Sequence, residues 1–262
     1  MSLDIGDALR EGYERAIAPS GRQFFVAAFV VQLIQSVVSQ SREVSVETPF
    51  LDDPVVVEPG PLAVDFGPGT LALLGLAGSI LSVYILLVGI RLFVTDSPDR
   101  ISEVHYRENL LVPWINLFVG LIVFGILFGV GFVFFILPGL FVLTTLLFFG
   151  ARIAVEDENF VAGMSSSWRL TRGNRIRVFL LLLGVLVVLI GISIVFAIVA
   201  APISVASPAL GSVVELAGTA AGTVYGTATL ARAYVQLTRA EDVREEGLDE
   251  FDSPAEPEDT FW

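Results

Sequence analysis

The chain has 262 residues, of which 54% are hydrophobic and only 16% are charged, and its mean hydropathy is +0.77. About half of a soluble domain is apolar even when glycine is counted, so this composition excludes an ordinary soluble protein and indicates that most of the chain lies in a membrane. The formal net charge of −13, with arginine as the only strong base and no lysine, argues against nucleic acid as a partner.

The residue types that are missing narrow the chemistry further. Without cysteine the chain has no disulfide, no thiolate metal site and no cysteine nucleophile. Without lysine it cannot form the lysine-containing loop that cradles nucleotide phosphates. We interpret the acidic, lysine-free composition as that of a protein from a salt-loving archaeon.

The segment before the first apolar stretch is predicted to form an amphipathic helix, because apolar residues recur at every fourth position from Ile5 to Ile17. Its several acidic residues are wrong for a cleaved secretory signal, so we expect the first apolar stretch to be retained as an anchor. Two similar mixed segments run from Ile101 to Leu111 and from Phe160 to Leu170. We expect all three either to lie in the membrane interface or to serve as plain cytoplasmic connectors.

The apolar stretches are long enough for six transmembrane helices, since crossing about 30 Å of hydrocarbon takes about 20 apolar residues. Two long apolar regions are each divided into two spans, one at Leu137-Pro138-Gly139 and one at Pro202 and Pro208. The fourth span is short unless Arg152 reaches the headgroups. The predicted membrane domain covers residues 1–239, with spans at about 23–41, 67–91, 112–136, 139–155, 177–201 and 210–237.

The arginines divide unevenly between the two ends of these spans. Fourteen of the fifteen fall on the side that carries both termini, and only Arg42 falls on the other side. Basic residues are retained on the cytoplasmic side of membrane proteins. We therefore predict an all-α polytopic bundle in the cell membrane, a multi-pass protein whose N- and C-termini are cytoplasmic.

Two segments outside the spans are predicted to have structures other than transmembrane helices. The first outer loop carries valines at positions 44, 46 and 55–57 among prolines and glycine, and we expect a small hairpin there. Residues 240–262 hold ten acidic residues and two prolines. This composition predicts a disordered cytoplasmic tail, which either solvates the protein or recruits a partner.

Spans two and four end alike. The segments Gly89-Ile-Arg91-Leu-Phe-Val94-Thr-Asp96 and Gly150-Ala-Arg152-Ile-Ala-Val155-Glu-Asp157 match at Gly, Arg, Val and Asp, and span six has a weaker match at Arg232. These matches predict three pseudo-repeated pairs of spans, each preceded by an interfacial amphipathic helix. The three arginines are either plain anchors or a ring that holds lipid phosphates.

Glycines at every fourth position of span six, Gly218, Gly222 and Gly226, predict close helix packing. The packing is either within one subunit or between two copies, and we expect Gly125 and Gly129 of span three to form the facing surface. Small residues at this spacing let two helix backbones approach each other closely.

Candidates for catalysis or transport are few. Glu215 is the one acid within an apolar run and is either an interfacial carboxylate or an ion or proton site. The only histidine, His105, is not accompanied by a Gly-x-Ser-x-Gly elbow. The acidic residues from Glu156 to Glu158 are expected to solvate a loop. We expect no catalytic residue, no metal and no cofactor.

One segment resembles a known family pattern. It reads Ala154-Val-Glu156-Asp157-Glu-Asn-Phe-Val-Ala162-Gly-Met-Ser-Ser-Ser167-Trp168-Arg-Leu170-Thr171-Arg172-Gly173-Asn174. The order of acidic pair, Ala, then Ser-Trp-x-Leu-Thr-basic-Gly-Asn is similar to the membrane domain that accompanies some glycerophosphodiester phosphodiesterases, and to related six-span bacterial and haloarchaeal membrane proteins. The resemblance implies a six-span membrane fold. It brings no enzyme activity, because in those relatives the activity resides in a separate soluble domain.

The sequence thus predicts a non-enzymatic integral membrane protein that acts as a scaffold or lipid-interacting module. Its expected partners are membrane lipids, and other membrane proteins or a second copy of the chain. A small transporter or permease subunit is the alternative, because three repeats could enclose a central path. The candidate headgroup contacts are Arg91, Arg152, Trp168, Arg169, Arg172, Arg175 and Arg232.

Overall fold

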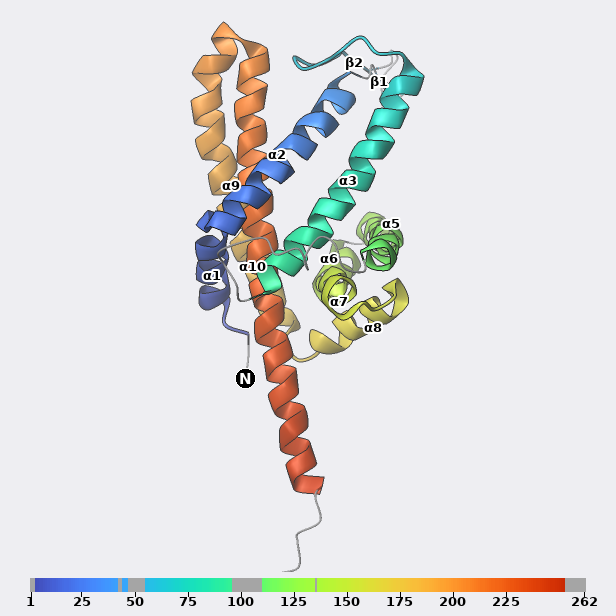
Figure 1. The fold of residues 1–262 in the computed structure, drawn as a ribbon, viewed down its shortest axis with the longest axis vertical. Coiled ribbons are helices and arrows are strands. Elements are labelled where there is room, and N and C mark those ends of the chain that lie inside the picture. Colours follow the sequence, from blue (N-terminus) through green and yellow to red (C-terminus); the bar gives the residue numbers. More distant parts are fainter. Residues whose placement is uncertain (1–2, 42–43, 47–54, 96–109, 135, 253–262) are drawn as a thin grey trace, which may run out of the picture.

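The computed structural model describes residues 3–41, 44–46, 55–95, 110–134 and 136–252. This part is helical apart from one short pair of strands, which confirms the all-α prediction (Figure 1). Its helices are α1 (Ile5–Ile17), α2 (Pro19–Gln40), α3 (Pro68–Val94), α5 (Leu111–Phe134), α6 (Ile136–Thr145), α7 (Phe149–Glu156), α8 (Phe160–Leu170), α9 (Arg175–Ala206) and α10 (Pro208–Asp252).

The two strands form the small antiparallel pair expected in the first outer loop. Strand β1 (Val44–Val46) pairs with β2 (Val55–Val57), and Val44 lies opposite Val57. β-branched residues favour extended backbone, so five valines in six strand positions account for the pairing.

Five helical segments are long and apolar enough to cross a membrane: Pro19–Gln40, Pro68–Val94, Leu111–Phe134, Ile136–Glu156 and Arg175–Ala206. Most of their surface faces outward; in Leu111–Phe134, for example, only 11% of the most apolar window is buried. Contiguous exposed apolar surface of this extent needs lipid around it, so the chain is a membrane protein. Helix α10 is not among the five, because glycine, threonine and Glu215 lower the mean hydropathy of its apolar part.

The long helices do not all run in one direction. Helices α2, α3, α9 and α10 run along the length of the molecule, whereas α5, α6 and α7 are seen nearly end-on (Figure 1). Helix α5 ends at Phe134, just before the expected turn, and Pro138 lies in the first turn of α6, where proline is tolerated. The expected arrangement of six spans in three repeats is not confirmed, because α5 packs mainly on α6 rather than along the other long helices.

Helix α10 lies at the centre of the packing and contacts α1, α2, α3 and α9. Its buried positions carry small side chains, including Ala220, Ala228, Thr229 and Ala233. At Gly12 of α1, an added Cβ would lie 2.7 Å from the Cα of Thr229, so the two backbones are in close approach. Small residues on α10 therefore let four helices pack directly against its backbone.

The glycine row of α10 packs against α9. An added Cβ would lie 2.7 Å from Phe196 at Gly218 and 3.1 Å from Leu189 at Gly222, whereas Gly226 has open space. The expected facing surface was wrong, since Cβ atoms built at Gly125 and Gly129 of α5 also meet only open space. The reason is topological: α9 and α10 are joined by a tight turn and lie side by side over much of their length.

Two glutamines of α2 hold it to its neighbours inside the apolar region. Gln32 donates to the hydroxyl of Thr223 in α10 at 2.8 Å, and Gln35 donates to that of Ser79 in α3 at 3.4 Å. Hydrogen bonds of this kind between helices contribute to their association in an apolar environment.

The segments between the long helices agree in part with the sequence analysis. The first and third expected amphipathic segments are helices with the predicted ends, α1 and α8. Most of the middle one, residues 101–109, lies outside the described residues, as does His105. Helix α10 continues to Asp252, so the tail expected to be disordered from residue 240 begins as helix. Four of the residues from 240 to 252 are glutamate, which favours helix.

The close approach of α1 to α10 makes a prediction about stability. In Gly12→Ala the new methyl group would be 2.0 Å from the Thr229 hydroxyl, so we expect overpacking to cost about 1–3 kcal/mol. Thermal unfolding of the purified protein in detergent measures this loss. Gly226→Ala is the matched control, because its methyl group enters open space. Equal melting temperatures for the two variants would show that α1 does not pack on α10 in this way.

Candidate functional site

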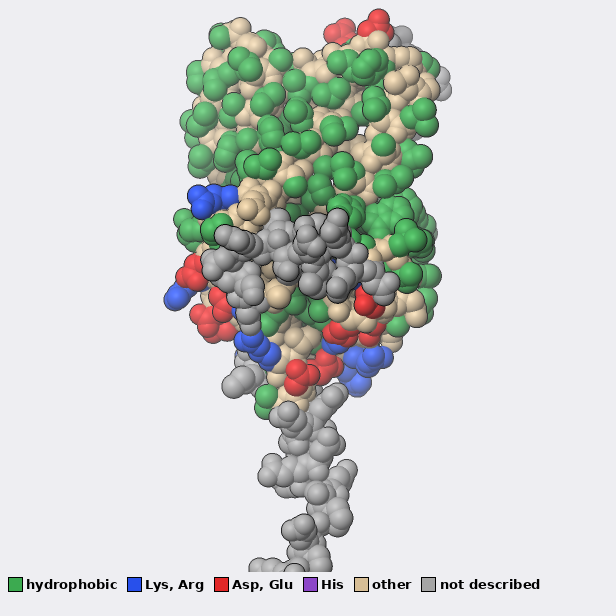
Figure 2. Space-filling view, viewed as in Figure 1, with side chains coloured by type: hydrophobic (Ala, Val, Ile, Leu, Met, Phe, Trp, Pro, Cys, Tyr) green, Lys and Arg blue, Asp and Glu red, His purple; other side chains and the backbone are tan. Residues whose placement is uncertain are grey.

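Charged side chains gather at one end of the molecule, below an apolar body (Figure 2). We call this region the charged end; it is built from α1, α7, α8, the lower part of α10 and the ends of α3 and α9. It contains the segment 154–174 that carries the recognisable sequence pattern. The two termini of the described chain also lie there (Figure 1).

Ser167 and Thr171 of the pattern form hydrogen bonds to backbone groups at the break between α6 and α7. Between α6 and α7 the carbonyl of Thr145 and the N–H of Phe148 leave the regular helical ladder. The Ser167 hydroxyl donates to Thr145 O at 3.0 Å and accepts from Phe148 N at 3.1 Å, and the Thr171 hydroxyl lies 3.3 Å from the same carbonyl. Both hydroxyls are fully buried, so they satisfy backbone groups that would otherwise be costly to bury.

The start of α8 is fixed by capping groups. The Asn159 side chain accepts from the N–H groups of Val161 and Ala162, and Asn116 of α5 accepts from Phe160 N at 3.2 Å. Before this cap the chain turns through Asp157, whose φ is +54°. Glu158 accepts from Ser166 at 2.8 Å and so links the turn to α8.

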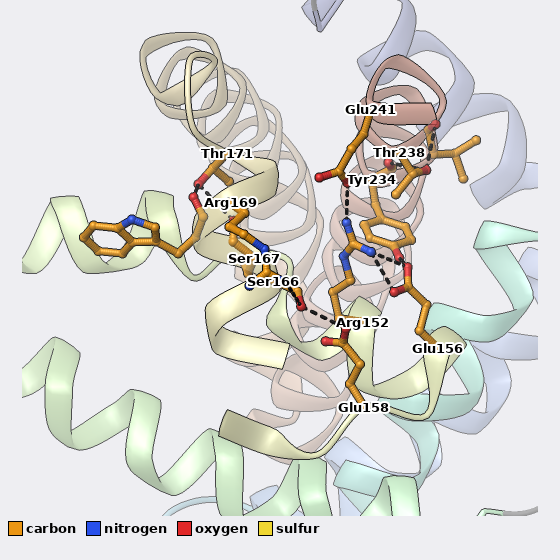
Figure 3. A network of polar contacts seen from close by, with 12 residues as sticks. Arg152, Glu156, Glu158, Ser166, Ser167, Arg169, Thr171, Tyr234, Thr238 and Glu241 are labelled. Atoms are coloured by element: carbon orange, nitrogen blue, oxygen red, sulfur yellow. Dashed lines mark hydrogen bonds and ion pairs between the residues drawn. The ribbon is translucent and has the colours of Figure 1, made fainter. Parts of the chain in front are cut away.

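Arg152 is the centre of a polar network between α7 and α10 (Figure 3). Its guanidinium bonds Glu156 at 2.6 Å within α7 and Glu241 of α10 at 2.7 Å. The Tyr234 hydroxyl of α10 donates to Glu156 as well. Only 12% of the Arg152 side chain is exposed, so these partners balance a charge that is largely removed from water.

The other two arginines of the repeat are also paired with acids from distant segments. Arg91, at the end of α3, bonds Asp157 at 3.1 Å, and Arg232 of α10 bonds Glu11 of α1 at 2.6 Å. The Arg232 side chain is 8% exposed and that of Arg91 14% exposed. Together with Arg152 they form a chain of ion pairs that ties α3 to the α7–α8 turn, α7 to α10, and α10 to α1.

These pairs bear on two expectations. Each of Arg91, Arg152 and Arg232 bonds a carboxylate of the protein, which favours a structural role, while the phosphate-binding ring and plain anchoring stay predictions. The acids from Glu156 to Glu158 do more than solvate a loop, since each bonds a side chain of another residue while Asp157 stays 52% exposed. Their arginine partners are largely buried, and burying a charge is costly unless a partner lies at hydrogen-bond distance.

The sequence analysis missed the partners Glu11, Tyr234 and Glu241. One signal was available: Asp157 is the acid of the repeated segment, and it pairs with the arginine of the other copy, Arg91. Glu241 had been assigned to a disordered tail, so its contact with Arg152 could not be anticipated.

Trp168 and Arg175 form an aromatic and cationic stack on α6. The Trp168 ring meets Phe141 edge to face at 5.3 Å, and the Arg175 guanidinium lies 4.6 Å from the Trp168 ring and 4.9 Å from the Phe141 ring. Trp168 remains 43% exposed. The stack therefore places an indole and a guanidinium at the boundary between the apolar body and the charged end.

The turn between α8 and α9 leaves two arginines at the surface beside a cavity. Arg169 donates to Ser165 and Ser166 of its own helix, and Arg172 has no side-chain partner among the described residues. Both border a cavity of about 280 Å³ between this turn and α10, with Glu241 on the opposite wall. Gly173 has a left-handed backbone, with φ of +90°, whereas Asn174, with φ of −115°, does not.

Glu215, the candidate for an ion or proton site, is exposed on α10 near its start. Its backbone carbonyl accepts from Thr219, as in a regular helix. This position adds no observation in favour of a transporter.

The comparison with sequence families found one match. A family described as a domain of unknown function, DUF7847, matches residues 3–237. The match covers most of the chain, so the chain belongs to this family. No curated protein and no solved structure matches it.

The Arg152 network makes a prediction about stability. In Arg152→Gln the carboxylates of Glu156 and Glu241 lose their common partner, and we expect a loss of about 3–5 kcal/mol, because breaking a buried pair leaves charge uncompensated. Thermal and denaturant unfolding in detergent measure the loss. The control is Arg10→Gln, whose arginine forms a pair that is 75% exposed on the arginine side and should matter little. Equally small effects in both variants would contradict the network.

Proposed function

We propose that this member of the DUF7847 family is a non-enzymatic integral membrane protein that serves as a scaffold or lipid-interacting module. The observation that carries the proposal is the exposed turn between α8 and α9, where Trp168 stands beside Arg169 and Arg172. Tryptophan is enriched at membrane interfaces, and arginine binds phosphate through paired hydrogen bonds.

The geometry narrows the set of lipid contacts. Arg91, Arg152 and Arg232 are committed to internal ion pairs, and Arg175 is stacked on two rings. Of the seven candidates, Trp168, Arg169 and Arg172 remain with enough exposure to meet a headgroup. We propose these three as the contacts with anionic lipid.

The resemblance to the membrane domain of glycerophosphodiester phosphodiesterases is consistent with this role. The residues that carry it, such as Ser167, Thr171 and Asn159, satisfy backbone groups and cap a helix. These contacts support the proposal that the shared pattern has a structural role in this chain and in the membrane domain that it resembles. We do not extend a phosphodiesterase activity to this chain.

We propose a multi-pass position in the cell membrane with both termini cytoplasmic, and with α5 and the segment of α6 and α7 (Ile136–Glu156) as two of six spans. The uneven division of arginines supports the orientation. The length of α5 supports the span, because its 24 residues extend about 36 Å as a helix. Its exposed apolar side chains, including Ile126, Val133 and Phe134, support a lipid environment on nearly all sides.

Single-cysteine labelling tests this topology, because the chain has no cysteine of its own. We expect Ser165→Cys to react with an impermeant maleimide only when the cytoplasmic side is exposed, and Leu137→Cys to react from outside. A Leu137→Cys that reacts only from the cytoplasmic side would place the α5–α6 hairpin in the inner interface and leave four spans. A Ser165→Cys that reacts only from outside would reverse the orientation.

The lipid contact is tested by thermal unfolding in nanodiscs of two compositions, one zwitterionic and one with phosphatidylglycerol. We expect anionic lipid to raise the melting temperature, and Arg172→Gln to remove about 1 kcal/mol of that stabilisation. Arg10→Gln removes the same charge from an exposed position on α1 and serves as the control. If anionic lipid had no effect, or if the two variants behaved alike, the α8–α9 turn would not be the contact.

A further inference from the structure

A second lipid-facing feature is a groove of about 400 Å³ on the opposite side of α10 from α6 and α8. It lies between α1, α2, α9 and α10; α1 and α10 contact each other, and each of them also contacts α2 and α9. The groove is formed by Tyr13, Ala16, Ile17, Arg22, Phe25, Val188, Ile192, Ala221, Val224 and Tyr225. We call it the α1–α2 groove.

The walls of the α1–α2 groove are apolar along its length. Val188 and Ile192 are one turn apart on α9, and Ala221 and Val224 occupy adjacent turns of α10. Ala221 is small, so it leaves open the space that a larger side chain would fill. Walls of this kind suit a hydrocarbon chain, since about 0.8 kcal/mol accompanies the burial of each CH₂ group.

Three polar groups in the groove have no partner among the described residues: the Arg22 guanidinium and the hydroxyls of Tyr13 and Tyr225. Arg22 is exposed, at the start of α2 where the apolar stretch begins. Tyr225 is only 6% exposed and still makes no hydrogen bond. The Tyr225 hydroxyl is not among the unpartnered side-chain atoms that are closed off from solvent, so an acceptor oxygen of a bound molecule can reach it and complete this wall.

We propose that the α1–α2 groove binds one phospholipid, with the phosphate on Arg22 and an acyl chain along Val188, Ile192 and Ala221. The proposal rests on the membrane placement in the proposed function and adds a specific lipid site to it. The Tyr225 hydroxyl donates to an oxygen near the glycerol. Arg22 holds the negative charge of the phosphate through two parallel N–H donors.

The charge and size of the groove favour a net-anionic phospholipid. Arg22 is the one charged residue among the residues that form it, and no acid stands there to bind the ammonium group of a zwitterionic headgroup. The volume falls within the range of about 300–1,000 Å³ that is usual for small-molecule sites. Free phosphate would engage Arg22 but would leave the apolar wall unfilled.

Native mass spectrometry of the detergent-purified full chain tests the site. The probes are phosphatidylglycerol, phosphatidylcholine and inorganic phosphate, and we expect one phosphatidylglycerol to bind more tightly than either of the others. Arg22→Gln should weaken it at least about tenfold, and Tyr225→Phe about three- to tenfold. Ala221→Phe should abolish it by filling the groove.

Matched controls keep the test specific. Arg10→Gln removes one exposed charge from α1, and Val187→Phe adds a ring to an exposed position of α9 outside the groove. Both should bind as the parent does. The proposal is overturned if Arg22→Gln binds phosphatidylglycerol as tightly as Arg10→Gln does, or if inorganic phosphate binds as tightly as the lipid. Should Ala221→Phe fail to fold, Tyr225→Phe, which only loses a hydroxyl, decides the matter.

The two lipid proposals fail separately. Loss of the Arg22 effect in detergent, with the Arg172 effect intact in nanodiscs, would reject the groove and keep the α8–α9 turn as the lipid contact. The reverse result would keep the groove and reject the turn. Labelling that placed the start of α2 outside the membrane interface would overturn both the topology and the groove.

Discussion

The close approach of neighbouring helices to the small side chains of α10 is the constraint on which the rest of the structure depends. Lipid tails are as apolar as leucine, so helices in a membrane gain little from hydrophobic association and rely on packing and hydrogen bonds. In α10 the buried alanines and Thr229 allow α1, α2, α3 and α9 to reach its backbone. The bond from Gln32 to Thr223 then adds a polar contact where the helices are already close. Helix α10, whose hydropathy is modest, thereby positions several helices that are far more apolar.

At the charged end, ion pairs determine which segments lie next to one another. A largely buried guanidinium is costly unless an acid lies beside it, so Arg91, Arg152 and Arg232 each hold a carboxylate from another segment. Such pairs contribute less to net stability than to the choice of neighbour, because an incorrect neighbour leaves a charge unpaired. The hydroxyls of Ser167 and Thr171 act in the same way on the backbone, since only this placement of α8 satisfies the break between α6 and α7. The sequence pattern of the α7–α9 region is thus explained by hydrogen bonds that the fold requires.

Local features could be predicted from the sequence, and long-range ones could not. The four-residue spacing gave both ends of α1, and the valines gave the strand pair, because each depends on neighbouring residues alone. Glu241, which bonds Arg152, and Glu11, which bonds Arg232, come from segments far away in the chain, and no spacing rule connects them to these arginines. Glycine spacing correctly indicated close packing at Gly218 but could not say which helix would face it. Hydropathy likewise identified α5 and α6 without giving their direction, since an apolar surface on all sides has no preferred face.

The arginines fall into two classes, and the division separates structural from ligand-facing positions. Those that close a repeated segment are largely buried and paired, so they hold the helices together and have little capacity left for lipid. Arg22 and Arg172 are exposed and have no side-chain partner among the described residues; Arg22 lies in the first turns of α2 and Arg172 in the turn before α9, and each borders a cavity. The small residues of α10 contribute both to helix packing and to the α1–α2 groove. At Thr229 they allow another helix to pack closely against α10, and at Ala221 they leave open space. An unpaired cation beside such a space is therefore a better indicator of a lipid site than the number of arginines on one face.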